Sequence, residues 1–138
     1  MGHHLVKRLE SDGHELICLN SKNCDLTKND SINQFADLEL DRIYHLAAWT
    51  QAGDFCLKHP GEQWIINQKI NSSIINFWFE NQPKTKLITM GTSCSYDPHL
   101  PLIEENYLSG KPIDSLFTYA MTKRIMESGL RAINQQFG

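Results

Sequence analysis

Hydrophobic residues recur at three- and four-residue spacing along several stretches of the chain, which is the pattern of helices with one buried face. The first stretch covers residues 3–12, where Leu5 and Leu9 share a face and Asp12-Gly13 provides a stop signal. A short helix follows over residues 30–38, and a long one over residues 60–80. The apolar stripe of the long helix consists of Ile66, Ile70, Ile74, Phe77 and Trp78. A last helix is predicted over residues 117–136.

Short apolar runs without a helical period alternate with these helices, and such runs are typical of buried strands. The predicted strands are residues 14–19, 42–48 and 85–90. Strands that alternate with helices of this length form a parallel sheet with helices on both faces. We therefore predict an α/β fold. In such folds ligands bind at the carboxyl ends of the strands, here after Leu19, Leu46 and Met90.

Composition excludes several classes of protein. The 138 residues are enough for one domain with a core, and 41% hydrophobic with 21% charged residues is typical of a folded chain. A net charge of −3 without basic runs argues against a nucleic-acid partner. The most apolar stretch, residues 64–79, is interrupted by polar side chains, so we predict no membrane span and a cytoplasmic location.

The cysteines and histidines show no spacing that indicates a structural or metal site. Cys18, Cys24, Cys56 and Cys94 are scattered along the chain, and we predict that they form no disulfides. None of the six histidines has the spacing of a ligand pair such as H-x-x-x-H, so we predict no metal site.

Tyr119 and Lys123 are the first candidates for chemistry. Residues four apart lie on one face of a helix, so both side chains can enter the same cleft. An unperturbed tyrosine has a pKa of about 10, and a nearby ammonium favours the phenolate. The pair is therefore either a catalytic acid with its tuning cation or two residues of a solvated helix surface.

Three ordered elements resemble one known family. They are the strand end Leu46-Ala47-Ala48, the polar turn of residues 91–96, and Tyr119 with Lys123. Together they resemble the extended short-chain dehydrogenase/reductases, the nucleotide-sugar epimerase and dehydratase family. The resemblance spans essentially the whole chain. It implies a Rossmann-like parallel sheet that binds NAD(P), and a nucleotide sugar as the substrate.

The resemblance also implies which residues bind the cofactor. Gly2 takes the place of the last glycine of the dinucleotide fingerprint, and the Asp25-Leu26 pair lies beside the adenine. The strand end of residues 46–48 contacts the nucleotide, and Asn67 belongs to the helix that begins at Pro60. After Leu19 the chain continues with Asn20, Ser21 and Lys22. Because no carboxylate is present there for a free ribose 2′-hydroxyl, NADP(H) is favoured over NAD(H).

Within the family, residues 91–98 and 101–105 most resemble the GDP-L-fucose synthase branch, which epimerises a GDP-4-keto-6-deoxy sugar and then reduces its ketone with NADPH. Carried over, Thr92 hydrogen-bonds the sugar carbonyl, Tyr119 donates the proton and Lys123 holds the nicotinamide ribose. Cys94 takes the place of the thiol used in epimerisation, although a small buried hydrophobe remains an alternative interpretation of this residue. Ser93 and Cys94 stand where dehydratases have an Asp-Glu pair, which argues against a dehydratase.

The resemblance covers only part of the family's length. It implies that residues 1–138 are a partial NAD(P)-binding Rossmann domain, without the first strand, most of the glycine-rich turn and the substrate domain. We therefore expect the isolated chain to be inactive. The alternative is a non-catalytic nucleotide-binding or dimerisation module derived from the same fold. In both cases the resemblance implies a homodimer through helices 60–80 and 117–136.

Overall fold

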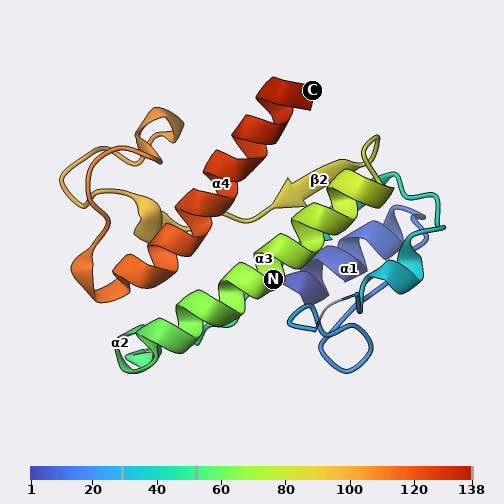
Figure 1. The fold of residues 1–138 in the computed structure, drawn as a ribbon, viewed down its shortest axis with the longest axis horizontal. Helices are drawn as coiled ribbons and strands as arrows, with labels where there is room; N and C mark the ends of the chain where they lie inside the picture. Colours follow the sequence, from blue (N-terminus) through green and yellow to red (C-terminus); the bar gives the residue numbers. More distant parts are fainter. Residues whose placement is uncertain (29, 52, 138) are drawn as a thin grey trace.

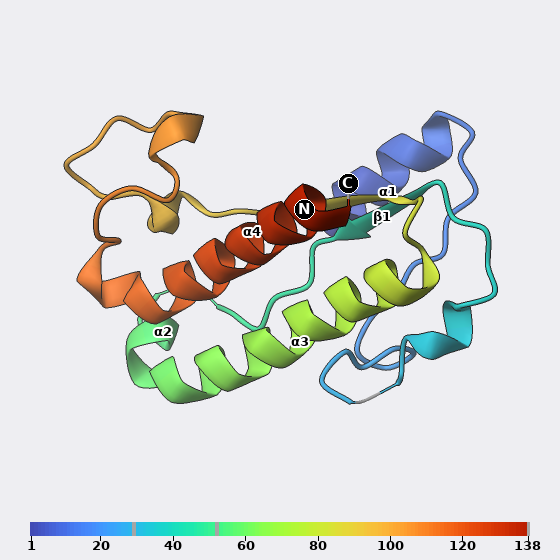
Figure 2. The ribbon, with the colours of Figure 1, turned by 45° about the horizontal axis from the view of Figure 1, so that its top comes forward.

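Two short parallel strands form the sheet of the computed structural model, which describes residues 1–28, 30–51 and 53–137. Strand β1 (Arg42–His45) pairs with β2 (Lys86–Thr89), with Arg42 opposite Lys86 and His45 opposite Thr89. The two predicted strands over residues 42–48 and 85–90 are thus confirmed, although both are shorter than predicted. Figure 1 shows β2 beside the long helix that precedes it in the chain, and β1 is labelled in Figure 2.

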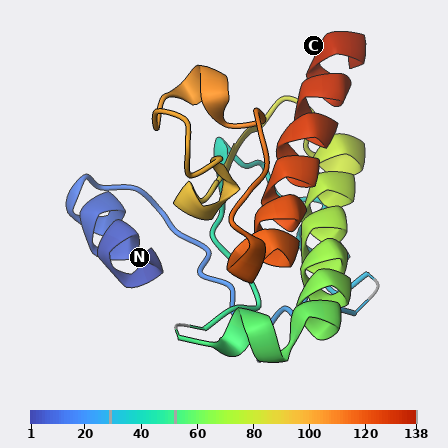
Figure 3. The ribbon, with the colours of Figure 1, turned by 90° about the vertical axis from the view of Figure 1, so that its left-hand side faces the viewer.

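Helices lie on both sides of this sheet, as predicted for an α/β fold. The long helices α3 (Pro60–Asn81) and α4 (Phe117–Phe137) run side by side (Figure 2), and α1 (Gly2–Ser11) lies on the opposite side of the strands (Figure 3). A four-residue helix, α2 (Phe55–Lys58), precedes α3. The described residues also form short 3-10 turns, which are η1 (Asn33–Phe35), η2 (Ser93–Ser95), η3 (Glu104–Asn106) and η4 (Asp114–Leu116). Within the described ranges, no helix is both long and apolar enough to cross a membrane.

The core forms where α3 covers the sheet. Ile74 and Phe77 of α3 are buried together with Cys24 and Ile32, and Ile43 of β1 and Leu87 of β2 pack against this cluster. Ile70, one turn before Ile74, is also buried. The predicted apolar stripe of α3 is therefore core over much of its length, and Trp64 and Ile65 at its start remain exposed.

Hydrogen bonds from the end of α3 determine where β2 begins. Trp78 Nε1 donates to the carbonyl of Thr85 at 2.8 Å, and Thr85 Oγ1 donates to the carbonyl of Leu40 at 2.7 Å. Gln82 Nε2 donates to the carbonyl of Leu38 at 2.7 Å. These bonds satisfy buried polar groups of the segment before β1 and tie it to the segment before β2, so the two strands start in register.

The predicted strand over residues 14–19 is wrong. This segment has no regular secondary structure, and the side chains of Ile17 and Leu19 are 51% and 43% exposed. A strand is stable only when its backbone groups are paired with a neighbour. No described strand lies beside residues 14–19, so the apolar sequence alone does not produce a strand.

The predicted helix over residues 30–38 is also wrong, because only the single turn η1 forms there. Asp30 adopts a left-handed conformation with φ of 61°. Ser31 Oγ donates to the carbonyl of Asp25 at 2.6 Å, which uses the hydroxyl for the preceding loop instead of for a helix cap. Ile32 and Phe35 nevertheless reach the core from this turn, so the apolar spacing indicated burial but not the element.

Replacing Ile74 with alanine tests the packing of α3 on the sheet. Ile74 is 5% exposed, so Ile74→Ala is expected to lower the free energy of unfolding by about 2–5 kcal/mol. The matched control is Ile65→Ala on the same helix, which should cost less than about 1 kcal/mol because Ile65 is 56% exposed. Urea unfolding measures both, and Ile74→Val provides a milder change. Equal losses in the two alanine variants would contradict the assignment of this core.

Candidate active site

The segments that follow the two strands meet at one edge of the sheet, because β1 and β2 are parallel. Leu46, Ala47 and Ala48 follow β1, and Gly91 and Thr92 follow β2. The predicted carboxyl-edge residues therefore come together after these two strands. Leu19 does not follow a strand, so the third predicted position is wrong.

Asn67 fixes the path of the chain after Ala48. Its side chain is 1% exposed, its Oδ1 accepts from the Trp49 amide at 2.9 Å, and its Nδ2 donates to the carbonyls of Trp49 (3.0 Å) and Gln63 (2.8 Å). Both amide protons are thus used within the protein. The predicted cofactor residue Asn67 consequently acts in this structure on the loop that follows the strand end.

A hollow of about 270 Å³ at this edge brings two predicted catalytic residues together. Cys94 enters it from η2 and Tyr119 from α4. The sequence analysis did not identify Cys56, which contributes a second thiol from α2 and accepts a hydrogen bond from Gln63 Nε2 at 3.3 Å. Among the described residues, the lining consists of Thr50, Gln51, Gly53, Cys56, Cys94, Leu116 and Tyr119.

Thr92 lies at the start of the turn that carries Cys94. Its Oγ1 accepts a hydrogen bond from the Cys94 amide at 3.3 Å, so the threonine caps η2. A hydroxyl that accepts from the backbone keeps its own proton free to donate. Thr92 is half-buried and can therefore both shape the turn and offer a donor to a ligand.

The phenol of Tyr119 is held in its protonated form. Burial raises the pKa of Tyr119, and Cys94, Cys56 and Tyr107 raise it further. The expectation that Lys123 would favour the phenolate is wrong in this structure, because desolvation of the half-buried phenol dominates and Lys123 is not among the groups that shift this pKa. A neutral phenol is the form that can give a proton away.

Lys123 lies one helical turn beyond Tyr119 and is 3% exposed. Burial lowers the pKa of its ammonium. Within the described part of the chain, Lys123 makes no hydrogen bond or ion pair, and a buried cation without partners is costly. Hydroxyl groups such as those of a ribose would supply the missing acceptors, so this residue fits the nicotinamide ribose that the sequence analysis assigned to it.

His45 links β1 to the two long helices, α3 and α4, through hydrogen bonds. Its imidazole is 3% exposed and its Nε2 donates to Asn71 Oδ1 at 3.0 Å. Asn71 Nδ2 in turn donates to the carbonyl of Thr122 on α4 at 3.5 Å. Burial lowers the pKa of His45, the bond to Asn71 opposes this, and the charge of Lys123 lowers the pKa further.

Gly2, Asn20 and Lys22 are further residues that are predicted to bind the cofactor. Gly2 opens α1 next to Leu46, since a Cβ on this glycine would lie 3.7 Å from Leu46 Cδ1. Asn20 Oδ1 accepts from the amide of Lys22 at 2.9 Å, and the lysine side chain is exposed.

Asp25 and Leu26 lie in the next loop. Hydrogen bonds from Thr27 lower the pKa of the Asp25 carboxyl, and its Oδ1 lies 2.7 Å from Thr27 Oγ1. Leu26 packs against the core cluster. The structure thus shows local partners for both residues, and their contact with an adenine stays a prediction.

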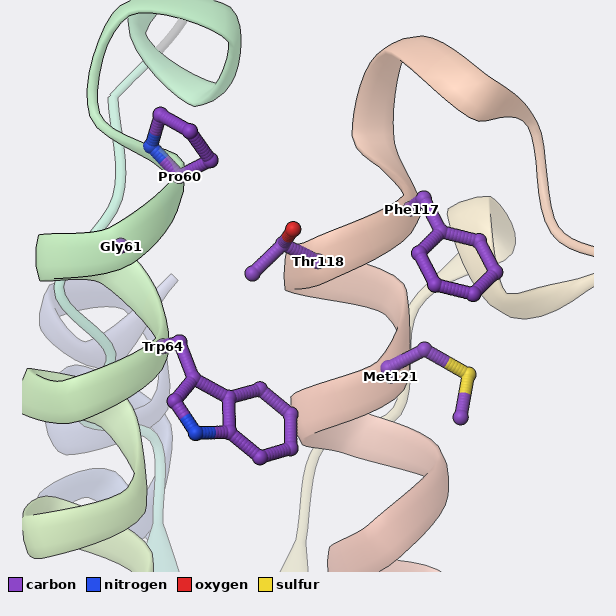
Figure 4. Close-up of a pocket in the computed structure, with 6 residues that line it drawn as sticks. All are labelled: Pro60, Gly61, Trp64, Phe117, Thr118 and Met121. Atoms are coloured by element: carbon purple, nitrogen blue, oxygen red, sulfur yellow. The ribbon is translucent and has the colours of Figure 1, made fainter.

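A larger open groove of about 420 Å³ lies between the first turns of α3 and α4. Trp64 projects from α3 toward α4 and Thr118 projects from α4 toward α3, while Phe117 and Met121 lie on the other side of α4 in this view (Figure 4). The lining that the described residues provide is almost entirely apolar and contains no titratable side chain. This groove is suited to packing rather than to acid-base chemistry.

Neither the cysteines nor the acidic residues form a metal site in the described ranges. Cys18, Cys24, Cys56 and Cys94 are free thiols. No group of three His, Cys, Asp or Glu side chains among these residues could hold a metal ion.

A parallel sheet with a tyrosine and a lysine one helical turn apart near its carboxyl edge defines a Rossmann-like α/β domain of the dinucleotide-binding class. The chain belongs to the NAD-dependent epimerase/dehydratase family, whose sequence pattern it matches over residues 1–138. The cofactor of this family is a nicotinamide dinucleotide.

Solved structures with the same fold include GDP-sugar enzymes. A GDP-L-fucose synthetase from Naegleria fowleri bound to NADP is 23% identical, with a TM-score of 0.84 over 98% of this chain and 44% of that chain. A GDP-mannoheptose C4 reductase from Campylobacter jejuni with NADP bound is 20% identical, with a TM-score of 0.88 over 99% of this chain and 41% of that chain. The chain therefore spans less than half the length of these proteins.

The buried His45 predicts a loss of stability in acid. The pKa of His45 in the folded protein lies below the ordinary 6.5, so on acidification the unfolded chain binds a proton before the folded protein does. The contribution of neutral His45 to the free energy of unfolding is complete above pH 6.5. It is lost as the pH falls through the folded-state pKa. His45→Gln removes this titration and keeps an amide donor for Asn71. Urea unfolding as a function of pH should therefore show a shallower acid slope for this variant. Equal acid slopes in the wild-type protein and in His45→Gln would contradict the assignment.

Proposed function

We propose that this domain belongs to a cytoplasmic NADP(H)-dependent nucleotide-sugar epimerase and reductase of the GDP-L-fucose synthase type, acting on a GDP-4-keto-6-deoxy sugar. The observation that carries the proposal is the common hollow of Tyr119 and Cys94, with Lys123 one turn along the same helix. Because the chain covers 44% of the length of the fucose synthetase, the activity is proposed for the enzyme that contains this domain.

Tyr119 is assigned the role of proton donor in ketone reduction. Bound NADP(H) supplies the hydride, and the ketone oxygen that receives the resulting negative charge needs an acid and hydrogen-bond donors. The neutral phenol of Tyr119 provides the proton. Thr92 donates its free hydroxyl proton to the same oxygen, and the Lys123 ammonium holds the ribose hydroxyls.

Cys94 is assigned one of the two proton transfers of epimerisation, at one face of the sugar, and the group at the opposite face is not assigned to a residue of this chain. A carbon next to a ketone is acidic enough for a side-chain base to remove its proton and for an acid to return one to the other face. Cys94 lies in the same hollow as Tyr119, and its amide is bound to Thr92, the residue assigned to the ketone oxygen. Proton exchange and carbonyl binding are thus assigned to two residues of one turn.

NADP(H) is proposed as the cofactor instead of NAD(H). Residues 20–24 contain no carboxylate that could accept bonds from a free ribose 2′-hydroxyl, and Lys22 is exposed and available for a 2′-phosphate. The two structures described above were both solved with NADP bound, which supports the same choice.

Turnover of GDP-4-keto-6-deoxymannose with NADPH tests the proposed function. The assay compares the 138-residue chain with the product of the same reading frame extended in both directions. We expect reduction by the longer product, and Tyr119→Phe should lower its kcat by about 10²–10⁴-fold because the acid is lost. Cys94→Ser should mainly reduce solvent-deuterium incorporation next to the ketone. Ser115→Ala, at an exposed position before α4, is the control.

Activity of the extended product that does not depend on Tyr119 would reject the assigned roles. Turnover by the 138-residue chain alone would overturn the expectation that it is inactive. If neither protein turns over substrate but a defined dimer forms, the non-catalytic module is the better interpretation.

We also propose a homodimer through α3 and α4. The exposed apolar side chains at the open face of these helices include Trp64, Ile65, Phe117 and Ile125, and Trp64 and Phe117 line the groove of Figure 4. Apolar groups on two parallel helix faces are suited to a four-helix interface with a second copy.

A charge in the groove is expected to separate this dimer. Trp64→Glu should weaken dimerisation about thirtyfold or more, since buried tryptophans are frequent hot spots of interfaces. Size-exclusion chromatography with light scattering over a range of concentrations gives the dissociation constant. Ile17→Glu, which changes an exposed apolar residue outside α3 and α4, should leave the dimer intact. A monomer at all concentrations, or equal effects of both variants, would exclude this interface.

A further inference from the structure

Arg124 is a buried cation of α4 that the proposed reaction does not use. It is 8% exposed, and all its hydrogen bonds go to backbone carbonyl oxygens. Nε donates to Ser95 at 2.8 Å, Nη1 donates to Gly110 at 2.8 Å and more weakly to Leu108 at 3.4 Å, and Nη2 donates to Ser109 at 2.7 Å. Within the described ranges no carboxylate forms an ion pair with this guanidinium.

Two separate segments meet at this guanidinium. One is η2, the turn that carries Cys94, and the other is the loop of residues 108–110. A guanidinium is a planar fork of five N–H donors, so it can hold several carbonyls at fixed angles, whereas a lysine ammonium is a single point of charge. Arg124 therefore fixes both segments to α4 in one geometry.

Ser95 is attached to α4 a second time. Its side chain is fully buried, and its Oγ donates to the carbonyl of Ala120 at 3.3 Å. Ala120 and Arg124 are four residues apart and share one face of the helix, just as Tyr119 and Lys123 share the adjacent face. The same two turns of α4 therefore hold η2 on one face and carry the proposed acid, Tyr119, on the adjacent face.

The loop of residues 108–110 is itself closed against η2. Asp97 Oδ2 accepts from the amide of Lys111 at 3.0 Å. Gly110 has a φ of 61°, and a Cβ at this position would lie 2.2 Å from Asp97 Oδ2, so only glycine fits. The carbonyls that face Arg124 are consequently held from the other side as well.

We propose that Arg124 is a positioning residue for the thiol of Cys94, which it sets against Tyr119 by binding the carbonyl of the next residue. The inference rests on the proposed function, since it is that function which gives the thiol and the phenol a common substrate. Arg124 itself does not line the hollow. Its effect on Cys94 passes through Ser95.

The rate at which iodoacetamide alkylates each cysteine tests this role without substrate or dinucleotide. Peptide mass spectrometry follows Cys94, with exposed Cys18 as the internal reference and Cys24 of the core as the reporter of general loosening. In Arg124→Gln the turn is free to leave α4, so the rate at Cys94 relative to Cys24 should rise about tenfold or more, which corresponds to about 1.4 kcal/mol. Arg131→Gln, on the same helix but exposed, should change neither rate.

Two further variants keep the test decisive if Arg124→Gln does not fold. Arg124→Lys retains the charge but not the fork, so Cys94 should still become more reactive. In Arg124→Ala, guanidinium ion well below denaturing concentrations should restore the slow rate at Cys94, while sodium chloride at the same concentration should not.

The proposal is overturned if Cys94 keeps its wild-type rate in the Gln and Lys variants, or if Cys24 accelerates to the same extent, since the role would then be general stability. Because the readout needs no turnover, it is independent of the assay of the proposed function. If the extended product is inactive but the Arg124 variants release the thiol, the positioning role is supported and the proposed reaction is rejected. If the extended product is active but the thiol is unchanged in the variants, the proposed reaction is supported and the positioning role is rejected.

Discussion

Helix α4 buries two neighbouring cations, and the rest of the site depends on how each is satisfied. Removing a charge from water is costly unless other polar groups replace the solvent. The guanidinium of Arg124 is surrounded by backbone carbonyls, so its cost is offset inside the protein. The ammonium of Lys123 has no such partners in the described structure, and burial lowers its pKa. The polar groups that offset the burial of Arg124 are thus supplied by the backbone, whereas those that would offset the burial of Lys123 are supplied by a ligand in the proposed function.

Polar residues at the carboxyl edge of the sheet are also divided between groups that bond within the protein and groups that are left free. Asn67 holds the backbone of Trp49 with its oxygen and one amide proton and gives the other proton to the carbonyl of Gln63. Thr92 uses an oxygen lone pair to hold the amide of Cys94. Groups near the hollow thus shape the loops with part of their bonding capacity. The hydroxyl proton of Thr92, the thiol of Cys94 and the phenol of Tyr119 are the groups to which the proposed reaction assigns chemistry.

Residue spacing along the sequence predicted the long helices well, because their backbone hydrogen bonds form between residues close in sequence. The spacing of Ile70, Ile74 and Phe77 identified α3 and its buried face, and the four-residue spacing of Tyr119 and Lys123 placed both on α4. Residues 14–19 are also apolar, but a strand must form hydrogen bonds with a neighbouring strand. The local sequence does not show whether such a neighbour is present. The roles found for Arg124 and His45 were missed for a related reason. Both depend on contacts with residues at least 14 positions away.

Helix α1 is less buried than α3, and this difference affects how easily each helix opens. It has regular backbone hydrogen bonds, yet none of its residues is buried. Amide hydrogens in such a helix exchange with deuterium through local opening, whereas those of α3, which carries the core, require much larger unfolding. The domain thus consists of a cooperative unit formed by the sheet, α3 and α4, and of a helix that can fray without disturbing it. Gly2, the residue predicted to approach the cofactor, therefore lies on the part of the structure that costs least to open.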